Sequence, residues 1–358
     1  MHGKNILICP LDWGIGHSTR CIPIIRRLLN AGANVIIAAD KRPYALLKKE
    51  FPDLEFIRLP GYDVTYPTDS RMALKMVLQS PRIIMVISRE HRALRRLVKR
   101  HRIDLVISDG RFGLWSKLIP CIYMTHQTMV KFPVWMKPLE PIFHRLHRWL
   151  IKQYTECWIP DYAGEKNITG DLSHKYPLPQ NALYTGPLTR FFRYDSTETT
   201  RELLVILSGP EPQRTIFERL VVDQLQNIPS LKALILQGKT EVDNDIKISD
   251  NARIVSHLSS SEINEAFLSS DIILSRPGHS TVMDLAILGK KAILVPTPGQ
   301  TEQEYLAGKF MREKVYYSEA QDGFDLRRAL KRVKEYTGLD MVTDSEEIVV
   351  ERVKNLLS

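Results

Sequence analysis

Short apolar runs rich in β-branched residues alternate along the chain with longer amphipathic segments, and this alternation occurs twice. In the first half the runs that predict strands are NILICP, NVIIAAD, EFIRLP, DLVIS and CIYMT. The segments that predict helices are 17–31, 41–50, 70–102, with a break near Pro81, and 138–154. Strands that alternate with helices are typical of a parallel sheet covered by helices. The first half therefore predicts a doubly wound α/β domain.

A second set of elements follows a turn-rich stretch at residues 185–200. Its predicted strands are RELLVILSG, LKALILQG, ARIVSH, DIILS and KAILVP, and residues 345–357 predict a closing helix. The predicted organisation is a Rossmann-like domain at 1–186, a linker at 187–200, a second Rossmann-like domain at 201–342 and a C-terminal helix at 343–358. Such sheets bind ligands at the carboxyl ends of their strands, so we expect the ligand site in a cleft between the domains.

Composition narrows the class of protein. Hydrophobic residues make up 44% and charged residues 25% of the 358 residues, which is typical of a folded globular protein. The first residues, MHGKNILICP, lack the long apolar stretch of a signal peptide, so we expect a cytoplasmic protein. Cys9, Cys21, Cys121 and Cys157 lie far apart without C-x-x-C spacing, which indicates neither a zinc cluster nor a redox pair.

Positive charge is concentrated in the first half. Residues 1–200 contain 30 Lys and Arg against 17 Asp and Glu, whereas residues 201–358 contain 20 against 24. Residues 88–102 are strongly basic, and residues 131–154 interleave basic with aromatic side chains. This pattern favours peripheral contact with an anionic membrane surface, although a solvated helix face is the alternative. No nucleic-acid-binding motif accompanies the charge, so nucleic acid is not an expected partner.

The loop LDWGIGHSTR follows the first predicted strand and lies at the expected ligand edge. Gly14 and Gly16 would let a ligand approach the backbone, and His17 would open the next helix. The loop is not a dinucleotide fingerprint, because Thr19 stands where G-x-G-x-x-G needs its third glycine. Histidine has the pKa range for proton transfer, so His17 is the candidate base; Asp12 could orient it or act as the base itself.

A second motif lies in DIILSRPGHSTVMDLAILGKKAILVPTPGQTEQEYLAGKF, residues 271–310. A predicted strand leads into a helix that begins at about Thr281, and free backbone N–H groups with the positive end of a helix favour an anion such as a diphosphate. Asp284, in the same helix, could accept hydrogen bonds from ribose hydroxyls. The polar run 301–304 follows the next strand and reaches the same edge.

Residues 256–310 resemble the donor-binding region of GT-B glycosyltransferases, particularly family 28 and its branch that adds N-acetylglucosamine to the lipid-linked peptidoglycan precursor. The loop Gly14–His17 and the segments SDGRFG, IPCIYMTHQ and TGPLTR resemble further parts of that family, so the resemblance covers nearly the whole chain. It implies a GT-B fold, with an acceptor-binding N-terminal domain, a nucleotide-sugar-binding C-terminal domain and a C-terminal helix that packs towards the first domain.

The resemblance also implies roles for individual residues. Asp284 stands where the family usually has glutamate, and Glu304 stands where the peptidoglycan branch has the second of two glutamines. Expected around the donor are Gly14, Gly16, Ser208, Gly209, Arg214, Leu258, Arg276, Gly278, His279, Ser280, Thr281, Asp284, Gln303 and Glu304. Expected around the acceptor are Asp109, Arg111, His126 and Gln127.

These observations predict an inverting transfer of a hexose or N-acetylhexosamine from a UDP-sugar to a lipid-linked or other anionic acceptor in cell-envelope glycan synthesis. The protein would act in the cytoplasm, peripherally on the inner face of the membrane. His17 would remove the acceptor proton, while the helix terminus and Arg276 would stabilise the leaving diphosphate. The single D-x-D string, Asp243-Asn244-Asp245, is interpreted as a surface loop, and neither a metal nor another cofactor is expected.

The sequence is also compatible with other classes of protein. The string GIGHSTR is similar to the G-x-G-H-x-x-R loop of UDP-sugar hydrolases of the pseudaminic acid pathway, in which the histidine activates water, and Arg20 completes that string. A non-hydrolysing epimerase is a further alternative. A nucleotide-sugar or polyanion binding protein would keep the region Arg276–Asp284 but would tolerate loss of His17.

Overall fold

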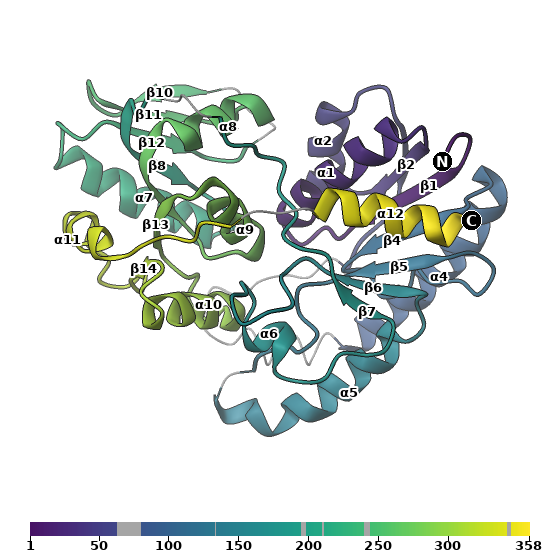
Figure 1. The fold of residues 1–358 in the computed structure, drawn as a ribbon. Helices are drawn as coiled ribbons and strands as arrows, with labels where there is room; N and C mark the ends of the chain where they lie inside the picture. The colour runs from purple at the N-terminus through teal and green to yellow at the C-terminus, as the bar shows by residue number, and fades with distance from the viewer. Residues whose placement is uncertain (63–79, 133, 195–197, 210, 240–243, 342–344) are drawn as a thin grey trace. The chain divides into compact units, whose positions relative to one another are not determined.

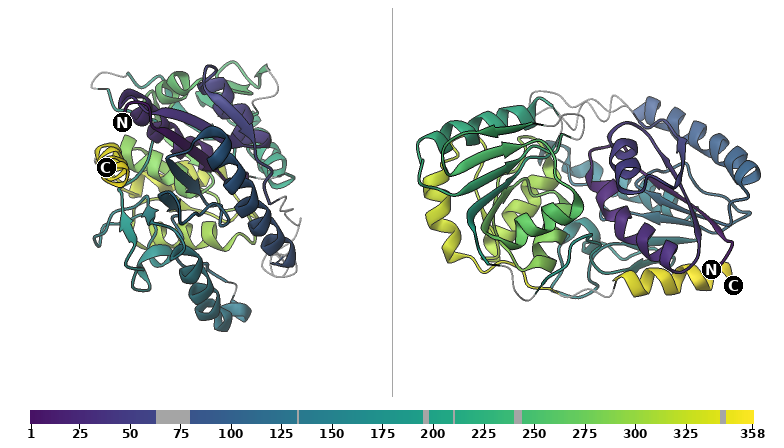
Figure 2. Two further views of the ribbon diagram at one scale, coloured as in Figure 1. Left: turned by 90° about the vertical axis from the view of Figure 1, so that its right-hand side faces the viewer. Right: turned by 90° about the horizontal axis from the view of Figure 1, so that it is seen from above.

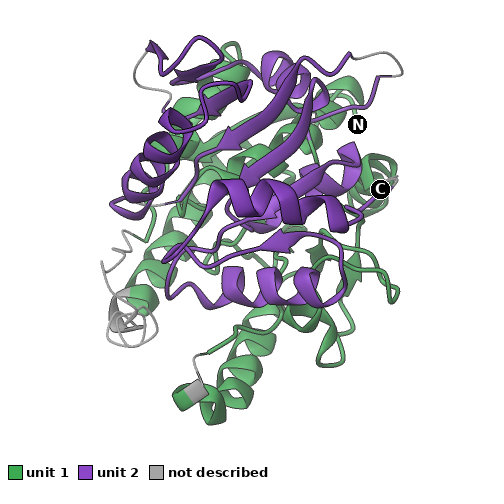
Figure 3. Cartoon of the chain, turned by 90° about the vertical axis from the view of Figure 1, so that its left-hand side faces the viewer, with its two compact units in different colours: residues 1–65, 73–189, 343–358 green, residues 66–72, 190–342 purple. Residues whose placement is uncertain are grey.

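The computed structural model describes residues 1–62, 80–132, 134–194, 198–209, 211–239, 244–341 and 345–358. The chain forms two compact units (Figure 3). Unit 1 comprises residues 1–65, 73–189 and 343–358, and unit 2 comprises residues 66–72 and 190–342. Within the described residues, each unit is built on one seven-stranded sheet (Figure 1).

The sheet of unit 1 is parallel throughout, with the strand order β3-β2-β1-β4-β5-β6-β7. The order confirms the doubly wound fold predicted for the first half. Its strands are β1 (Asn5–Pro10), β2 (Asn34–Ala39), β3 (Glu55–Arg58), β4 (Leu105–Asp109), β5 (Cys121–Met124), β6 (Glu156–Ile159) and β7 (Ala182–Tyr184).

Both faces of this sheet are covered, because alternate strand residues point to opposite sides. On one face, Ile6 and Ile8 of β1 pack with the apolar side of α1 (Gly16–Asn30) and with α2 (Lys41–Glu50). On the other face, Leu7 and Cys9 pack with α4 (Ser80–His101) and α5 (Glu140–Ile151). Parallel strands buried on both faces read as continuous apolar runs, which is why the sequence predicted β1, β2 and β4.

The C-terminal helix α12 (Ser345–Leu357) returns to unit 1 and packs beside α1 (Figure 2). Val349 and Val353 of α12 are fully buried in the same hydrophobic cluster as α1. The hydroxyl of Ser345 donates to the carbonyl of Pro187 at 2.7 Å, and Arg352 pairs with the buried Glu156 at the start of β6. The helix therefore completes the core of unit 1, as the resemblance to GT-B proteins implied.

The sheet of unit 2 has the order β10-β11-β9-β8-β12-β13-β14, and only the β10–β11 pair is antiparallel within the described residues. Its strands are β8 (Arg201–Ile206), β9 (Ala233–Leu236), β10 (Asp245–Lys247), β11 (Ala252–Val255), β12 (Ser270–Ser275), β13 (Lys291–Leu294) and β14 (Tyr317–Ser318).

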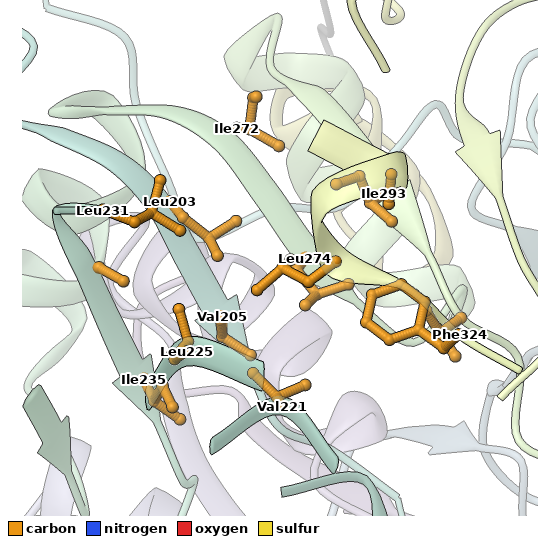
Figure 4. Packing of buried hydrophobic residues seen from close by; sticks show 14 of the residues in the cluster. Leu203, Val205, Val221, Leu225, Leu231, Ile235, Ile272, Leu274, Ile293 and Phe324 are labelled. Carbon is orange, nitrogen blue, oxygen red and sulfur yellow. The ribbon is translucent and has the colours of Figure 1, made fainter. Parts of the chain in front are cut away.

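The helices of unit 2 pack against this sheet. On one face, Leu203, Val205 and Leu274 pack against Val221 and Leu225 of helix α7 (Figure 4). The helices are α7 (Gln213–Gln226), α8 (Ser260–Leu268), α9 (His279–Leu288), α10 (Thr301–Arg312) and α11 (Leu326–Arg332).

The structure differs from the sequence prediction at several elements. Strands β6, β7, β10 and β14 were not predicted, because they have two to four residues and no long apolar run. Asp245 begins the exposed edge strand β10 and so does not lie in the predicted surface loop. Helix α9 begins at His279, two residues before the predicted start. Asp243 and the first ten residues of the predicted helix 70–102 lie outside the described residues.

Candidate active site

The carboxyl ends of β1 and β4 meet where the strand order of the unit 1 sheet reverses. Chain order runs from β1 to β2 and β3 on one side, while β4 to β7 lie on the other. Pro10 is in register with Asp109, and the N–H of Leu11 donates to the carbonyl of Asp109 at 2.9 Å. Ligands of doubly wound sheets bind at such a switch point. The loop after β1 and the residues after β4 therefore form the candidate ligand edge of unit 1.

His17 lies in the first turn of α1, with its imidazole beside the end of β4. Its Nδ1 is 3.0 Å from Oδ1 of Asp109, and its side chain is 17% exposed. Gly110 has a φ of +74°, and a Cβ atom at this position would lie only 3.0 Å from Cε1 of His17. Glycine is thus required at position 110 both by the backbone conformation and by the closeness of the ring.

Arg20, one turn after His17, forms a buried ion pair with Asp109. Its Nε donates to Oδ2 at 2.7 Å, its Nη2 donates to Oδ1, and both side chains are almost completely buried. Burial alone would raise the pKa of Asp109, but Arg20 and His17 outweigh it and lower the pKa to about 2. Asp109 is therefore a permanent anion beside the imidazole. Arg20 was noticed in the sequence only as part of the string GIGHSTR, and no role in orienting His17 was predicted.

The charge state of His17 follows from these neighbours. Burial lowers the pKa of His17, the positive charge of Arg20 lowers it further, and Asp109 raises it by less than the sum of the other effects. Its Nδ1 lies between Oδ1 of Asp109, which can only accept a hydrogen bond, and Nη2 of Arg20 at 2.9 Å, which can only donate one, so these two contacts orient the ring. The Nε2 atom makes no hydrogen bond within the described part of the chain. Nε2 is therefore the ring nitrogen available to a ligand at this edge.

A second imidazole is held by the same arginine. Nη1 of Arg20 is 3.0 Å from Nδ1 of His126, which lies just after β5, so this nitrogen accepts the hydrogen bond. The side-chain amide of Gln127 lies 3.3 Å from that Nε2 atom. The structure thus brings His126 and Gln127 to the edge that holds His17 and Asp109, although acceptor binding by these residues stays a prediction.

Asp12 does not orient His17. Its carboxylate is 3.4 Å from the N–H of Tyr62 and 3.9 Å from Nζ of Lys41, and it is packed against Gly61. The predicted alternative, in which Asp12 positions the imidazole, is corrected, because Asp109 occupies that place.

Arg111 also has a different role from the one predicted. Its fully buried guanidinium donates from Nε to Glu90 at 2.7 Å and from Nη1 to the carbonyl of Leu59 at 3.2 Å. Glu90 in turn accepts from the hydroxyl of Tyr62 at 2.8 Å. The side chain therefore ties α4 to the loop after β3, and it does not line the edge for an acceptor.

Unit 2 has the same type of switch point, between β8 and β12. Ser208 and Gly209 follow β8, and Gly209 has a φ of +101°. After β12 the chain enters α9, with Gly278 as its N-cap and His279, Ser280 and Thr281 in its first turn. The N-terminus of a helix favours an anion through its backbone N–H groups and its dipole. The donor residues predicted in these two loops thus lie at one sheet edge.

Arg276, between β12 and α9, is turned into the interior of unit 2. It is fully buried, and its donors contact the carbonyls of Val295 and Pro296 at 3.0 Å and that of Gln213 at 3.2 Å. Its guanidinium lies 4.2 Å from the ring centre of Phe217. Burial lowers the pKa of Arg276 to about 9. Its Nε has no hydrogen-bond partner within the described residues, whereas contact of a diphosphate with Nη1 or Nη2 would require the side chain to leave these carbonyls.

Arg214 is likewise engaged within unit 2. Its Nε donates to Glu211 at 2.8 Å and its Nη1 donates to Glu218 at 3.0 Å. Two carboxylates therefore balance its charge, so Arg214 is engaged within unit 2, and its expected contact with the donor stays a prediction.

Further donor candidates in unit 2 lie in the loop after β11, within α9 and in the first turn of α10. Oε1 of Gln303 accepts from the N–H of Thr297 at 2.8 Å, and Oε1 of Glu304 accepts from the N–H of Gly299 at 2.8 Å. These contacts shape the loop after β13. Leu258 lies in the loop between β11 and α8, and Asp284 lies half-buried on α9.

Two general features of the described residues bear on the site. They contain no group of three or more His, Cys, Asp or Glu side chains placed to hold a metal ion. Among the same residues, no helix has the length and apolar character needed to cross a membrane.

Comparison with known families matches each half of the chain to a glycosyltransferase model. Residues 207–335 match the glycosyltransferase family 28 C-terminal domain, and residues 5–132 match a model of glycosyl transferase family 1.

The curated relatives have low sequence identity to this chain, but the matches extend over most of both chains. A glycosyltransferase of Methanosarcina acetivorans is 22% identical over 84% of this chain and 81% of its own. The UDP-N-acetylglucosamine--N-acetylmuramyl-(pentapeptide) pyrophosphoryl-undecaprenol N-acetylglucosamine transferase of Ruminiclostridium cellulolyticum is 24% identical over 87% of this chain and 88% of its own.

Solved structures share the fold. The glycosyltransferase of kitacinnamycin has a TM-score of 0.63 at 13% identity, with 99% of this chain and 94% of that chain covered. MurG of Acinetobacter baumannii has a TM-score of 0.55 at 13% identity, with 98% and 99% covered. The two doubly wound units and these likenesses define a GT-B glycosyltransferase. Within that class, the chain resembles glycosyltransferases of the family 28, MurG-like type.

We expect His17→Gln to lower kcat by roughly 10²- to 10⁴-fold, because the variant keeps a polar side chain but loses the basic nitrogen. The measurement is steady-state release of nucleoside diphosphate from a sugar nucleotide in a transfer assay. Asp12→Asn is the matched control, and its kcat should stay within about threefold of wild type, since Asp12 does not contact the imidazole. A larger loss in Asp12→Asn than in His17→Gln would contradict the assignment.

The pH dependence of kcat/KM should reflect the lowered pKa of His17. A base acts when deprotonated, so activity should stay constant as the pH falls through 6.5 and should decline only at lower pH. Asp109→Asn removes an anion that raises the pKa of His17, and the decline should then move to still lower pH. An acid limb centred above pH 6.5 in the wild type would show that another group carries the proton.

Proposed function

We propose that the protein transfers a hexose or N-acetylhexosamine from a UDP-sugar to a lipid-linked or other anionic acceptor in cell-envelope glycan synthesis, without a metal and with inversion at the anomeric carbon. The observation that carries the proposal is the imidazole of His17, which Asp109 and Arg20 hold through Nδ1 at the ligand edge of unit 1, with Nε2 unpartnered among the described residues. The family 28 C-terminal domain in unit 2 supports a nucleotide-sugar donor. Two relatives named as UDP-N-acetylglucosamine transferases support UDP as the nucleotide and a lipid-linked acceptor.

The proposed reaction begins with removal of the proton from an acceptor hydroxyl by Nε2 of His17. The oxygen then forms a bond to the anomeric carbon as the bond to the diphosphate breaks, and this direct displacement inverts the configuration. The proton remains on His17, where the carboxylate of Asp109 stabilises the imidazolium through Nδ1. The N-terminus of α9 stabilises the charge that develops on the departing diphosphate.

A lipid-linked acceptor requires access to a membrane surface, and α5 has the composition for such contact. Its exposed apolar residues continue the spacing of four and three residues from the preceding turn η1 (Val134–Leu139), so they form one apolar stripe along the helix. The stripe consists of Trp135, Leu139, Ile142, Leu146 and Trp149, and the first, third and last of these are 66%, 64% and 58% exposed. Arg145, Arg148 and Lys152 lie on the same segment and would attract anionic headgroups. The proposed location is therefore the inner face of the cell membrane.

The test of the proposed function is UDP release from a panel of UDP-sugars, with and without a membrane lipid extract and with EDTA in parallel. We expect release that needs the extract, persists in EDTA and falls by roughly 10²-fold or more in His17→Gln. UDP release at the same rate with and without the lipid extract would favour a UDP-sugar hydrolase. Binding of UDP-sugars without any release would favour a binding protein.

We expect Ile142→Glu/Trp149→Glu to weaken association with vesicles that contain anionic lipid by roughly tenfold or more, since the change removes apolar area and adds repulsion. Sedimentation with vesicles of phosphatidylcholine and 30% phosphatidylglycerol measures the association. Ile216→Glu, at another exposed apolar position in α7, is the control and should bind as the wild type does. Equal binding of the double variant and the control would exclude the apolar stripe as the contact.

A further inference from the structure

The loop after β13 contains a buried hydroxyl without a hydrogen-bond partner. Thr297 is 3% exposed, and its backbone is satisfied, because its N–H donates to Gln303 and its carbonyl accepts from Gln300 at 3.1 Å. Its Oγ1 atom makes no hydrogen bond within the described residues. A buried hydroxyl left in this state destabilises a protein, so native structures rarely keep one without a reason.

The hydroxyl of Thr297 faces the loop after β8. A Cβ atom built on Gly209 would lie 3.9 Å from Oγ1 of Thr297 and would meet no other heavy atom within 4 Å. In the sheet, β12 separates β8 from β13, so these two loops approach one another across the carboxyl end of β12. The space beside Gly209 is thus bordered by Thr297 at the switch point, where the chain also enters α9.

The surroundings favour an anion in that space. Ser275, the last residue of β12, has a second buried hydroxyl without a partner in the described structure. Arg276 follows it, and no carboxylate within the described residues forms an ion pair with this buried guanidinium. An anionic oxygen would accept a hydrogen bond from a hydroxyl and would lie in the field of an uncompensated positive charge.

We propose that the hydroxyl of Thr297 donates a hydrogen bond to a phosphate oxygen of the bound nucleotide donor, in a cradle formed by Gly209, Ser275 and the N-terminus of α9. The identity of the anion as a nucleotide diphosphate rests on the proposed function. The contact itself rests on the buried hydroxyl and the space beside Gly209. Thr297 was not among the residues that the sequence singled out, because one threonine in a polar loop gives no signal without its burial.

Thr297→Val tests this contact, because the substitution should maintain or raise the stability of the ligand-free protein while it weakens nucleotide binding. Valine has the shape of threonine but no hydroxyl, so the ligand-free variant should unfold at the same or a higher temperature than the wild type. Its Kd for UDP should nevertheless increase by roughly tenfold, the usual effect of losing a hydrogen bond to a charged group. Thr297→Ser keeps the hydroxyl and should bind UDP within about threefold of the wild type.

Thr185→Val is the matched control, because the buried hydroxyl of Thr185 donates to the carbonyl of Ile159 at 3.3 Å in unit 1. This variant should unfold at a lower temperature and bind UDP as the wild type does. Isothermal titration with UDP and with inorganic pyrophosphate, together with thermal unfolding, supplies the readouts for all four proteins.

The possible outcomes test the Thr297 contact independently of the proposed function. Equal affinities of Thr297→Val and the wild type for both probes would overturn the contact and leave the glycosyltransferase assignment standing. Pyrophosphate binding that is lost in Thr297→Val, without UDP binding in any variant, would support the contact and contradict UDP as the nucleotide. A wild-type protein that binds neither probe would overturn both proposals.

Discussion

The buried pair of Asp109 and Arg20 is the interaction on which the candidate site of unit 1 depends. Asp109 ends β4, and Arg20 lies in α1, so the pair joins the two elements that flank the switch point. Breaking a buried ion pair by removing one partner leaves an uncompensated charge and costs about 3–5 kcal/mol. The same carboxylate and the same arginine both contact Nδ1 of His17, so the interaction that holds the helix against the sheet also orients the imidazole.

This coupling explains why the site lies at the switch point. His17 is separated from Asp109 by 92 residues in the chain, and only the pairing of β1 with β4 brings them together. Gly110 leaves room for the imidazole at this place. His126 reaches the same arginine because β5 pairs with β4 on the next position of the sheet. Three loops that follow adjacent strands thus supply one hydrogen-bonded network.

Much of the fold could be predicted from the pattern of apolar residues, whereas side-chain partners could not. Long buried strands such as β1 and β8 have continuous apolar runs, but β10 is short, exposed and begins with a charged residue. His17 could be selected because its motif is local. Asp109 was selected as an acceptor residue and is in fact the partner of His17, because strand register is not visible in the sequence. Arg111 and Arg276 were assigned to ligands from their charge, since the sequence does not indicate that each is fully buried.

The partners of Arg214 and Arg276 change the expected basis of donor binding in unit 2. Arg214 is balanced by two carboxylates, and Nη1 and Nη2 of Arg276 donate to protein partners, so that only its buried Nε has no hydrogen bond within the described residues. What remains at the edge of unit 2 is backbone: Gly209 with its positive φ, and Gly278 at the start of α9. Partial charges fixed in the backbone need no rearrangement when a leaving group becomes more negative, which is the property that transition-state stabilisation requires. The buried charge of Arg276 then acts by holding the loop after β13 in place and through its field, and hydroxyls at the strand ends complete a donor site built from fixed dipoles.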